Sequence, residues 1–372
     1  MARMGILARV LWLSLKFFGF PLRAVASVKK LVDKRKSIHG IPGIVKYVAA
    51  GGRYFWSVDS PGWSSRAFDS FITTELRRAT GQSDVPGTLQ TVILAITNRC
   101  PLKCSHCYEW NNIDEKDRLK LTDLIKILQV LKENGIGHLQ LSGGEPLARF
   151  EDLLTIIRET GPDIDSWILT SGFGLTSEMA GRLKEAGLTG ANISLDHWDE
   201  REHNVFRNHQ RSFHWARQAV LNCRENDIVV SLSLCATSEF ATWENLGKYA
   251  ELAKDWGAGF IRILEPRRVG KFAGRDSRLG KEQLDILDDF YLAMNRESKY
   301  REYPIISYPG YHQRRMGCFG AGNRYLYIDS NGDYQACPFC QNGQGNALTT
   351  EISVAIKKMK ANGCHIYPSN HN

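Results

Sequence analysis

The chain has 372 residues, of which 43% are hydrophobic and 24% are charged, a composition typical of a folded globular protein. This length accommodates one barrel-type domain of about 200–250 residues with additional segments at its ends. The formal net charge is +8, and residues 1–36 account for all of it, with nine Lys or Arg residues against a single acidic residue. Because the rest of the chain is neutral overall, the basic charge does not indicate a nucleic-acid-binding protein, and no nucleic acid partner is expected.

Residues 1–36 are predicted to form a basic amphipathic N-terminal helix. Four of the cations recur every seven residues and therefore lie near one side of a helix, namely Arg9, Lys16, Arg23 and Lys30. Two of them interrupt the apolar run 6–18, which is too short to span a membrane. Gly19 and Pro21 favour a kink or a break. Three interpretations are open: a helix on an anionic membrane surface, a helix packed on the protein body, and a targeting segment.

Residues 37–88 are predicted to be a linker that packs irregularly on the core, because glycines and prolines alternate with aromatic residues there. From residue 89 to residue 300, apolar β-rich runs alternate with segments of helical periodicity. The predicted strands are residues 91–97, 138–144, 166–172, 190–196, 229–237 and 259–266. The predicted helices are residues 121–135, 150–161, 176–187, 212–227, 242–257 and 277–297.

Six successive strand–helix units imply an α/β fold with a parallel sheet covered by helices. Six units are fewer than the eight that close a full barrel, so the prediction is a partial (β/α)6 TIM-type barrel. A small cysteine-rich extension is expected to follow it over residues 301–372. In barrels of this type the chemistry takes place on the loops that follow the strands.

The chain has nine cysteines, and seven of them fall into two groups, within residues 100–107 and 318–364. We find no cleavable secretory signal, so a cytoplasmic location is expected, with peripheral membrane contact through residues 1–36 as an open alternative. In a reducing compartment, grouped cysteines are more often metal ligands than disulfides.

The first cysteine group has the spacing C-x3-C-x2-C, formed by Cys100, Cys104 and Cys107 directly after the first predicted strand. Three cysteines can bind three irons of a [4Fe–4S] cluster and leave the fourth iron open to a further ligand. A structural zinc site is the alternative, but such sites have four ligands. His106 as the fourth ligand would lie between two of the cysteines.

With the aromatic Tyr108 after its last cysteine, this segment resembles the signature of the radical S-adenosylmethionine (SAM) superfamily. The resemblance implies that exchangeable SAM binds to the open iron through its amino and carboxylate groups. It also implies reductive cleavage of SAM to a 5′-deoxyadenosyl radical, with an external reductant such as flavodoxin or ferredoxin.

Further motifs of this superfamily match at the ends of later strands. The segment 143–146 has the sequence Gly-Gly-Glu-Pro and resembles the motif that binds the SAM amino group. Ser171, Ser194 and Asp196 resemble positions that contact the SAM ribose or carboxylate, with Arg207 as a carboxylate partner. The alternatives are that a strand-end serine is a cap and that Arg207 is a solvated charge. The expected cofactor-binding residues are Tyr108, Gly143, Gly144, Glu145, Pro146, Ser171, Ser194, Asp196 and Arg207.

The second cysteine group comprises Cys318, Cys337, Cys340 and Cys364, with a hairpin predicted between the first two and its turn at residues 331–332. This pattern resembles the opening of the SPASM extension of radical SAM enzymes. The full extension has seven cysteines, so four imply the shorter twitch version, with one auxiliary iron–sulfur cluster. A four-cysteine zinc site is the alternative.

The sequence leaves the substrate open and singles out no catalytic side chain. Our first hypothesis is oxidative modification of a peptide or protein side chain, because relatives with this layout include peptide and protein maturases. The second is radical oxidation of a small or lipid-like metabolite, which only the basic, aromatic N-terminal segment favours. The third is a non-catalytic iron–sulfur module, against which the intact motif 143–146 argues.

Overall fold

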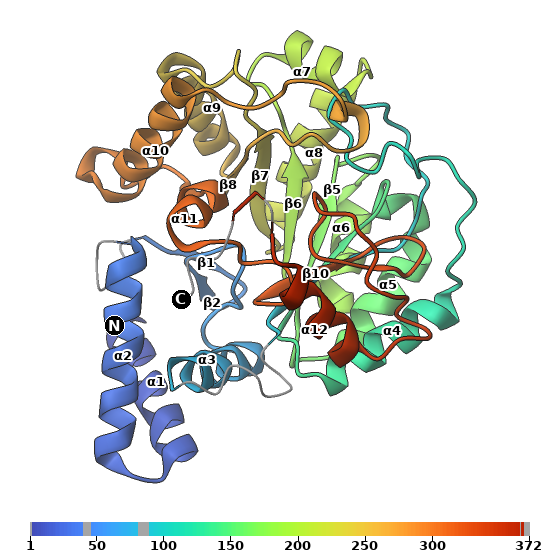
Figure 1. Cartoon of the computed structure of the whole chain (residues 1–372). Helices are drawn as coiled ribbons and strands as arrows, with labels where there is room; N and C mark the ends of the chain where they lie inside the picture. Colours follow the sequence, from blue (N-terminus) through green and yellow to red (C-terminus); the bar gives the residue numbers. More distant parts are fainter. Residues whose placement is uncertain (1, 40–45, 81–88, 365, 368–372) are drawn as a thin grey trace.

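The computed structural model describes residues 2–39, 46–80, 89–364 and 366–367. At its centre is a nine-stranded sheet with the order β11-β10-β3-β4-β5-β6-β7-β8-β9 (Figure 1). The strands from β3 to β9 are β3 (Thr91–Ala95), β4 (His138–Ser142), β5 (Asp165–Thr170), β6 (Gly190–Ser194), β7 (Val229–Cys235), β8 (Phe260–Leu264) and β9 (Ile305–Ser307). Each pairs in parallel with the next, which confirms the predicted partial barrel.

The six predicted helices are all present and cover the sheet with their buried apolar faces. They are α4 (Leu121–Glu133), α5 (Phe150–Thr160), α6 (Ser177–Ala186), α8 (Ser212–Glu225), α9 (Trp243–Trp256) and α10 (Lys281–Arg296). Local sequence sets their ends. In α9, for example, the Thr242 hydroxyl accepts a hydrogen bond from the backbone of Asn245, and Gly257 ends the helix in the left-handed conformation.

Several short elements were not predicted. They are α7 (Glu200–Arg207), α11 (Pro309–Met316), α12 (Ile352–Asn362) and three 3-10 turns, η1 (Pro146–Arg149), η2 (Gly270–Phe272) and η3 (Ser298–Tyr300). The seventh parallel strand, β9, was also missed, because three residues are too few to show a period of two.

The C-terminal extension joins the barrel sheet directly. The predicted hairpin is formed by β10 (Tyr325–Ile328) and β11 (Tyr334–Gln335), which pair antiparallel. Strand β10 also pairs in parallel with β3, from Tyr325 opposite Thr91 to Ile328 opposite Leu94. The extension therefore adds a strand beside β3, the strand that leads into the first cysteine loop.

The N-terminal segment is helical as predicted, and it divides into two helices at the break that Gly19 and Pro21 favoured. Helices α1 (Ala2–Phe18) and α2 (Pro21–His39) run side by side and project from the barrel (Figure 1). Gly19 breaks the helix with a φ of +69°, a conformation that glycine adopts without steric cost. Among the described residues, we find no helix long and apolar enough to cross the bilayer.

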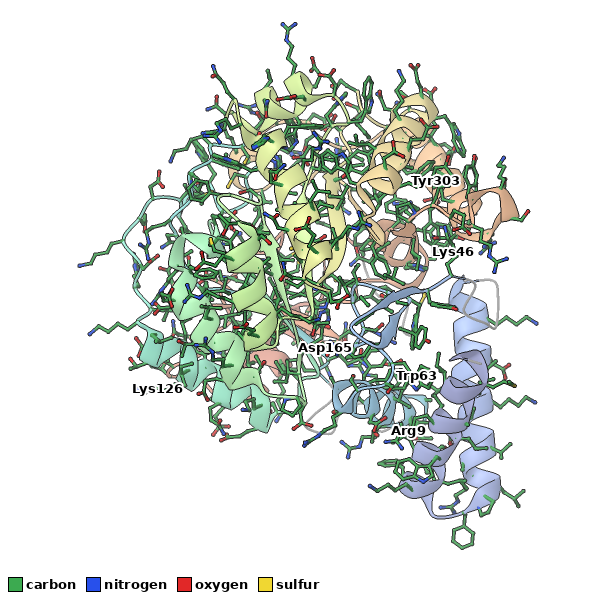
Figure 2. All side chains as sticks on the ribbon, turned by 180° about the vertical axis from the view of Figure 1, so that it is seen from behind. Arg9, Lys46, Trp63, Lys126, Asp165 and Tyr303 are labelled. Carbon is green, nitrogen blue, oxygen red and sulfur yellow. The ribbon has the colours of Figure 1, made fainter. Side chains whose placement is uncertain are left out.

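The helical hairpin is anchored on a third helix, α3 (Arg66–Ala79), in the region that was predicted to be irregular. Val10 and Leu13 of α1 pack with Phe68, Ile72 and Leu76 of α3 in one apolar cluster. Arg9 forms an ion pair with Asp69 at the same junction (Figure 2). In the chain segment that connects α2 to α3, β1 (Val48–Ala50) and β2 (Arg53–Phe55) form a small antiparallel sheet.

Candidate cofactor and active site

The first cysteine loop begins directly after β3, and its three cysteines line a cavity of about 670 Å³. Asp117 holds the start of this loop, because its carboxylate accepts hydrogen bonds from the Thr97 hydroxyl and the Asn98 backbone, both at 2.8 Å. Burial raises the pKa of Cys100 and of Cys107 to about 12. Both thiols therefore stay protonated until a metal displaces the protons. Three thiols on one loop, facing one cavity, fit a cluster with three protein ligands.

The glycine pair after β4 supports this loop from behind. Gly143 has a φ of +134°, and a Cβ atom there would collide with the carbonyl oxygen of Thr97. A Cβ atom on Gly144 would collide with the carbonyl oxygen of Arg99. These approaches let the Gly144 N–H donate to Thr97 and the Glu145 N–H donate to Arg99, both at 2.8 Å. The two glycines are thus needed for contact between the end of β4 and the cysteine loop.

The carboxylate of Glu145 is fully buried, and the end of β5 supplies most of its partners. It accepts hydrogen bonds from the Thr170 hydroxyl at 2.6 Å and from the backbone and hydroxyl of Ser171 at 2.8 and 2.5 Å. Burial raises the pKa of Glu145, although these hydrogen bonds oppose the shift. In this structure Ser171 therefore orients Glu145, a role that the sequence did not indicate. Pro146 is buried at the start of η1.

Arg207 ends the unpredicted helix α7 and is buried beside the first cysteine loop. Its Nε donates to Asp196 at 2.6 Å, and its Nη1 donates to the Sγ of Cys104 at 3.6 Å. Although burial favours the neutral acid, the neighbouring Arg207 lowers the pKa of Asp196. Arg207 is therefore not the solvated charge of the alternative interpretation. It brings a positive charge to a thiol that must become a thiolate to bind iron.

Tyr108 connects the first cysteine loop to the extension. Its hydroxyl lies 3.2 Å from that of Ser142, and its ring packs edge-on against Tyr327 and Phe339. The next residue, Glu109, is buried and accepts a hydrogen bond from the Tyr327 hydroxyl at 2.7 Å. Sequence reasoning missed Glu109, for which the only signal was a carboxylate directly after the cysteine motif.

The four cysteines of the second group also converge. All four line the same cavity, where Cys318 and Cys364, and Cys340 with Cys337 and Cys364, lie close enough to shift one another's pKa. The C-terminal segment is held here because the Cys318 N–H donates to the Tyr367 carbonyl at 3.2 Å. Within the described part of the chain, no three His, Cys, Asp or Glu side chains are placed to hold one metal ion.

The tertiary structure brings both cysteine groups and nearly all the expected SAM-binding residues to the wall of the same cavity. Those on the wall are Cys100, Cys104, Cys107, Tyr108, Gly143, Gly144, Glu145, Ser171, Ser194, Asp196, Arg207, Cys318, Cys337, Cys340 and Cys364. This convergence follows from the parallel sheet, in which the loops after successive strands meet at one edge.

This chain resembles known proteins in both sequence and structure. The family model described as Radical SAM superfamily matches residues 94–261. A probable GTP 3′,8-cyclase of Pyrococcus abyssi is 32% identical over 30% of this chain and 36% of the relative. A PqqA peptide cyclase of Methylocella silvestris is 28% identical over 48% of each protein. An Fe-coproporphyrin III synthase of Methanosarcina barkeri is 34% identical over 57% of this chain and 53% of the relative.

These matches span about a third to a half of the length of the curated relatives. Among solved structures, Streptococcus suis SuiB bound to S-adenosylmethionine has a TM-score of 0.60 at 17% identity, over 76% of this chain and 70% of SuiB. SuiB bound to its precursor peptide SuiA has a TM-score of 0.61 at 15% identity, over 90% of this chain and 77% of SuiB. At these identities the likeness establishes a shared fold. The family match, which contains the three-cysteine loop and the Gly-Gly-Glu-Pro segment, identifies residues 94–261 as a radical SAM superfamily domain.

Proposed function

We propose that this chain is a radical SAM enzyme of the oxidoreductase class, with a [4Fe–4S] cluster on Cys100, Cys104 and Cys107. The observation that carries the proposal is the position of these thiols, on a wall shared with Glu145 and Arg207. The bound cluster and SAM would supply one-electron cleavage of SAM to methionine and a 5′-deoxyadenosyl radical, which takes a hydrogen atom from the substrate. Flavodoxin or ferredoxin is the proposed electron donor.

The protein residues bind and orient the reactants in this proposal. The backbone of residues 143–145, fixed against the cysteine loop, is proposed to meet the SAM amino group. Ser194 and Asp196 at the end of β6 are proposed to meet its ribose or carboxylate. Arg207 is proposed to hold Asp196 and Cys104 in place through hydrogen bonds from its guanidinium.

A second iron–sulfur cluster is proposed on Cys318, Cys337, Cys340 and Cys364, in agreement with their convergence in the same cavity. It would accept an electron from the substrate or bind the substrate directly. The test is an iron and sulfide count on the wild type and on a variant with Cys100, Cys104 and Cys107 replaced by alanine. We expect the variant to keep about half of the iron, whereas zinc in its place, or loss of all iron, would refute the second cluster.

A peptide or protein side chain is the proposed substrate, and the enzyme is then a maturase. The structure of SuiB has been solved with the precursor peptide SuiA, and 90% of this chain superimposes on the SuiB fold. The relative from Methylocella silvestris is named a PqqA peptide cyclase. The cavity also suits a bound segment of chain, since its wall extends from the cysteine loops to the N-terminal region.

A small or lipid-like metabolite is the second candidate substrate, and one observation favours it. At the N-terminal side the cavity is lined by the apolar residues Leu31 of α2, Trp56, and Phe71 and Ile72 of α3. The same hairpin exposes large apolar side chains, with Phe20 at 69% and Leu22 at 87% of full exposure, beside the basic charge of residues 1–36. We propose that this hairpin contacts an anionic membrane surface from the cytoplasmic side.

Production of 5′-deoxyadenosine tests the central proposal. Reconstituted protein with SAM and dithionite should form 5′-deoxyadenosine and methionine, and the Cys104→Ala variant should form neither. Replacing dithionite with reduced flavodoxin should retain the reaction. The wild-type protein could instead bind SAM and hold four irons at the first cysteine group, yet form no 5′-deoxyadenosine. That result would indicate the non-catalytic iron–sulfur module.

A further inference from the structure

Four polar side chains form a continuous row on the inner face of the barrel. Ser194 of β6 lies opposite Ser233 of β7, Ser233 lies opposite Arg262 of β8, and Arg262 lies opposite Ser307 of β9. Residues directly opposite one another on neighbouring strands point to the same face, and all four of these line the cavity. The interior of a TIM-type barrel is usually filled by branched apolar side chains. A polar row there needs a separate explanation.

Asn192 adds an unpartnered group below this row. It precedes Ser194 by two residues on β6, so its side chain points to the same face. The residue is only 7% exposed and lies on the cavity wall, yet its Oδ1 has no hydrogen-bond partner among the described residues. Leaving a buried polar atom without a partner is unfavourable, so a ligand that supplies a donor is favoured there.

Arg262 gives the row its charge. Its Nη1 donates to the Asp59 carboxylate at 2.9 Å, and its side chain is 15% exposed. This ion pair uses one of the five N–H donors and fixes the orientation of the guanidinium. The remaining donors form the planar fork that binds a carboxylate through two hydrogen bonds. Ser233 and Ser307 lie opposite Arg262 on the two neighbouring strands, so their hydroxyl groups are on the same face of the sheet as its side chain.

We infer that Arg262, Ser233 and Ser307 form a binding subsite for a carboxylate group of the substrate, and that the Asn192 Oδ1 accepts a hydrogen bond from a donor group on the same substrate. The inference rests on the proposed function, because it places the substrate in the same cavity as the SAM site. Ser194 stays at the SAM end of the row, two strands from Arg262, a separation of about 10 Å at the usual strand spacing. Since Asp59 already offsets part of the charge of Arg262, a singly charged carboxylate fits the subsite better than a doubly charged phosphate.

Binding of three small probes tests the subsite without any turnover. The reconstituted protein, with saturating SAM and no reductant, is titrated with acetate, acetamide or methylphosphonate, and binding is followed by saturation transfer to the methyl protons. Saturating SAM excludes binding of the probes at the SAM site. We expect acetate to bind several-fold more tightly than either of the other two probes. Equal binding of acetamide, or preferred binding of methylphosphonate, would overturn the assignment to a carboxylate.

Variants of the ion pair between Arg262 and Asp59 test whether acetate binding depends on Arg262. Arg262→Gln should weaken acetate binding at least fivefold, whereas Asp59→Asn should strengthen it, because it removes a competing carboxylate. Arg268→Gln, at an exposed arginine in the loop that follows β8, is the matched control and should bind acetate as the wild type does. If Arg262→Gln does not fold, the Asp59→Asn result alone decides, and unchanged or weaker binding in that variant refutes the subsite. Acetate binding stays measurable even if SAM cleavage fails, so the two proposals can fail separately.

Discussion

Arg207 donates a hydrogen bond from Nη1 to the Sγ of Cys104 over 3.6 Å, and both residues are buried. The two lie 103 positions apart in the chain, one at the end of α7 and the other in the loop after β3. Through its Nε, the same guanidinium neutralises the buried carboxylate of Asp196. A cysteine of the first group, a cation and a carboxylate are therefore joined in one buried arrangement.

Replacement of Arg207 by Gln should destabilise the protein and weaken assembly of the first cluster. The substitution leaves Asp196 buried without its cation, which costs about 3–5 kcal/mol for a buried pair. Urea denaturation measures the loss of stability, and iron and sulfide counts measure assembly. Arg201→Gln, at an exposed position on the same helix, is the matched control and should change stability by less than about 0.5 kcal/mol. Wild-type stability of the Arg207 variant would contradict the buried ion pair.

Replacement of Gly144 by Ala should disrupt the first cysteine loop. The new Cβ atom would meet the carbonyl of Arg99, a backbone atom that cannot rotate away, so either the loop or the end of β4 must shift. We expect a loss of about 2 kcal/mol or more, with reduced iron content after reconstitution. Gly247→Ala in α9 is the control. No atom lies within 4 Å of a Cβ built there, so the helix should gain up to about 1 kcal/mol.

The stability of the protein should fall with pH below about 6.5, partly because of His203. Its Nδ1 accepts a hydrogen bond from the backbone N–H of Asp196 at 3.1 Å, and burial lowers the pKa of His203 from 6.5 to about 3. Between these values only the unfolded chain binds the proton. The contribution of this residue to the free energy of unfolding therefore falls by about 1.4 kcal/mol per pH unit as pH decreases.

Denaturation of the wild type and of His203→Gln at pH 7, 6 and 5 measures this contribution. The difference in unfolding free energy between the two proteins should shrink as pH falls from 6.5 towards 5. A difference that stays constant over this range would show that His203 is protonated in the folded state as readily as in the unfolded chain.

The double variant Phe20→Ser, Leu22→Ser should lose membrane binding but remain folded. Both side chains are mostly exposed at the turn between α1 and α2, so little packing is lost. Burial of such side chains in a lipid surface is worth about 1.5–3 kcal/mol each, so we expect at least a tenfold loss of partitioning. The measurement is flotation with vesicles that contain about a third phosphatidylserine, where residues 1–36 add electrostatic attraction.

A matched variant and neutral vesicles complete this test. Leu348→Ser removes an apolar side chain that is 42% exposed outside the hairpin, and it should float as the wild type does. Vesicles of phosphatidylcholine alone should bind the wild type less. Equal flotation of the hairpin variant and the wild type would exclude the hairpin as a membrane contact.

Features that depend on local sequence were predicted well. Helical and strand periodicity within short windows determined the six β/α units, because each window must bury one face. Elements without such a pattern were missed. Helix α7 buries only His203 and Arg207, and the spacing of Phe68, Ile72 and Leu76 in α3 was outweighed by the glycines and prolines before it.

By itself, the sequence determined that the chain contains a radical SAM domain, because three cysteines at fixed spacing after a strand, with Gly-Gly-Glu-Pro one strand later, form a local chemical pattern. Only the tertiary structure decided which side chains meet. The contact of Arg207 with Cys104, the position of Ser171 against Glu145 and the row that contains Arg262 all join residues distant in the chain. Strand register and the close approach of separate loops create these contacts, and neither is encoded in any single segment.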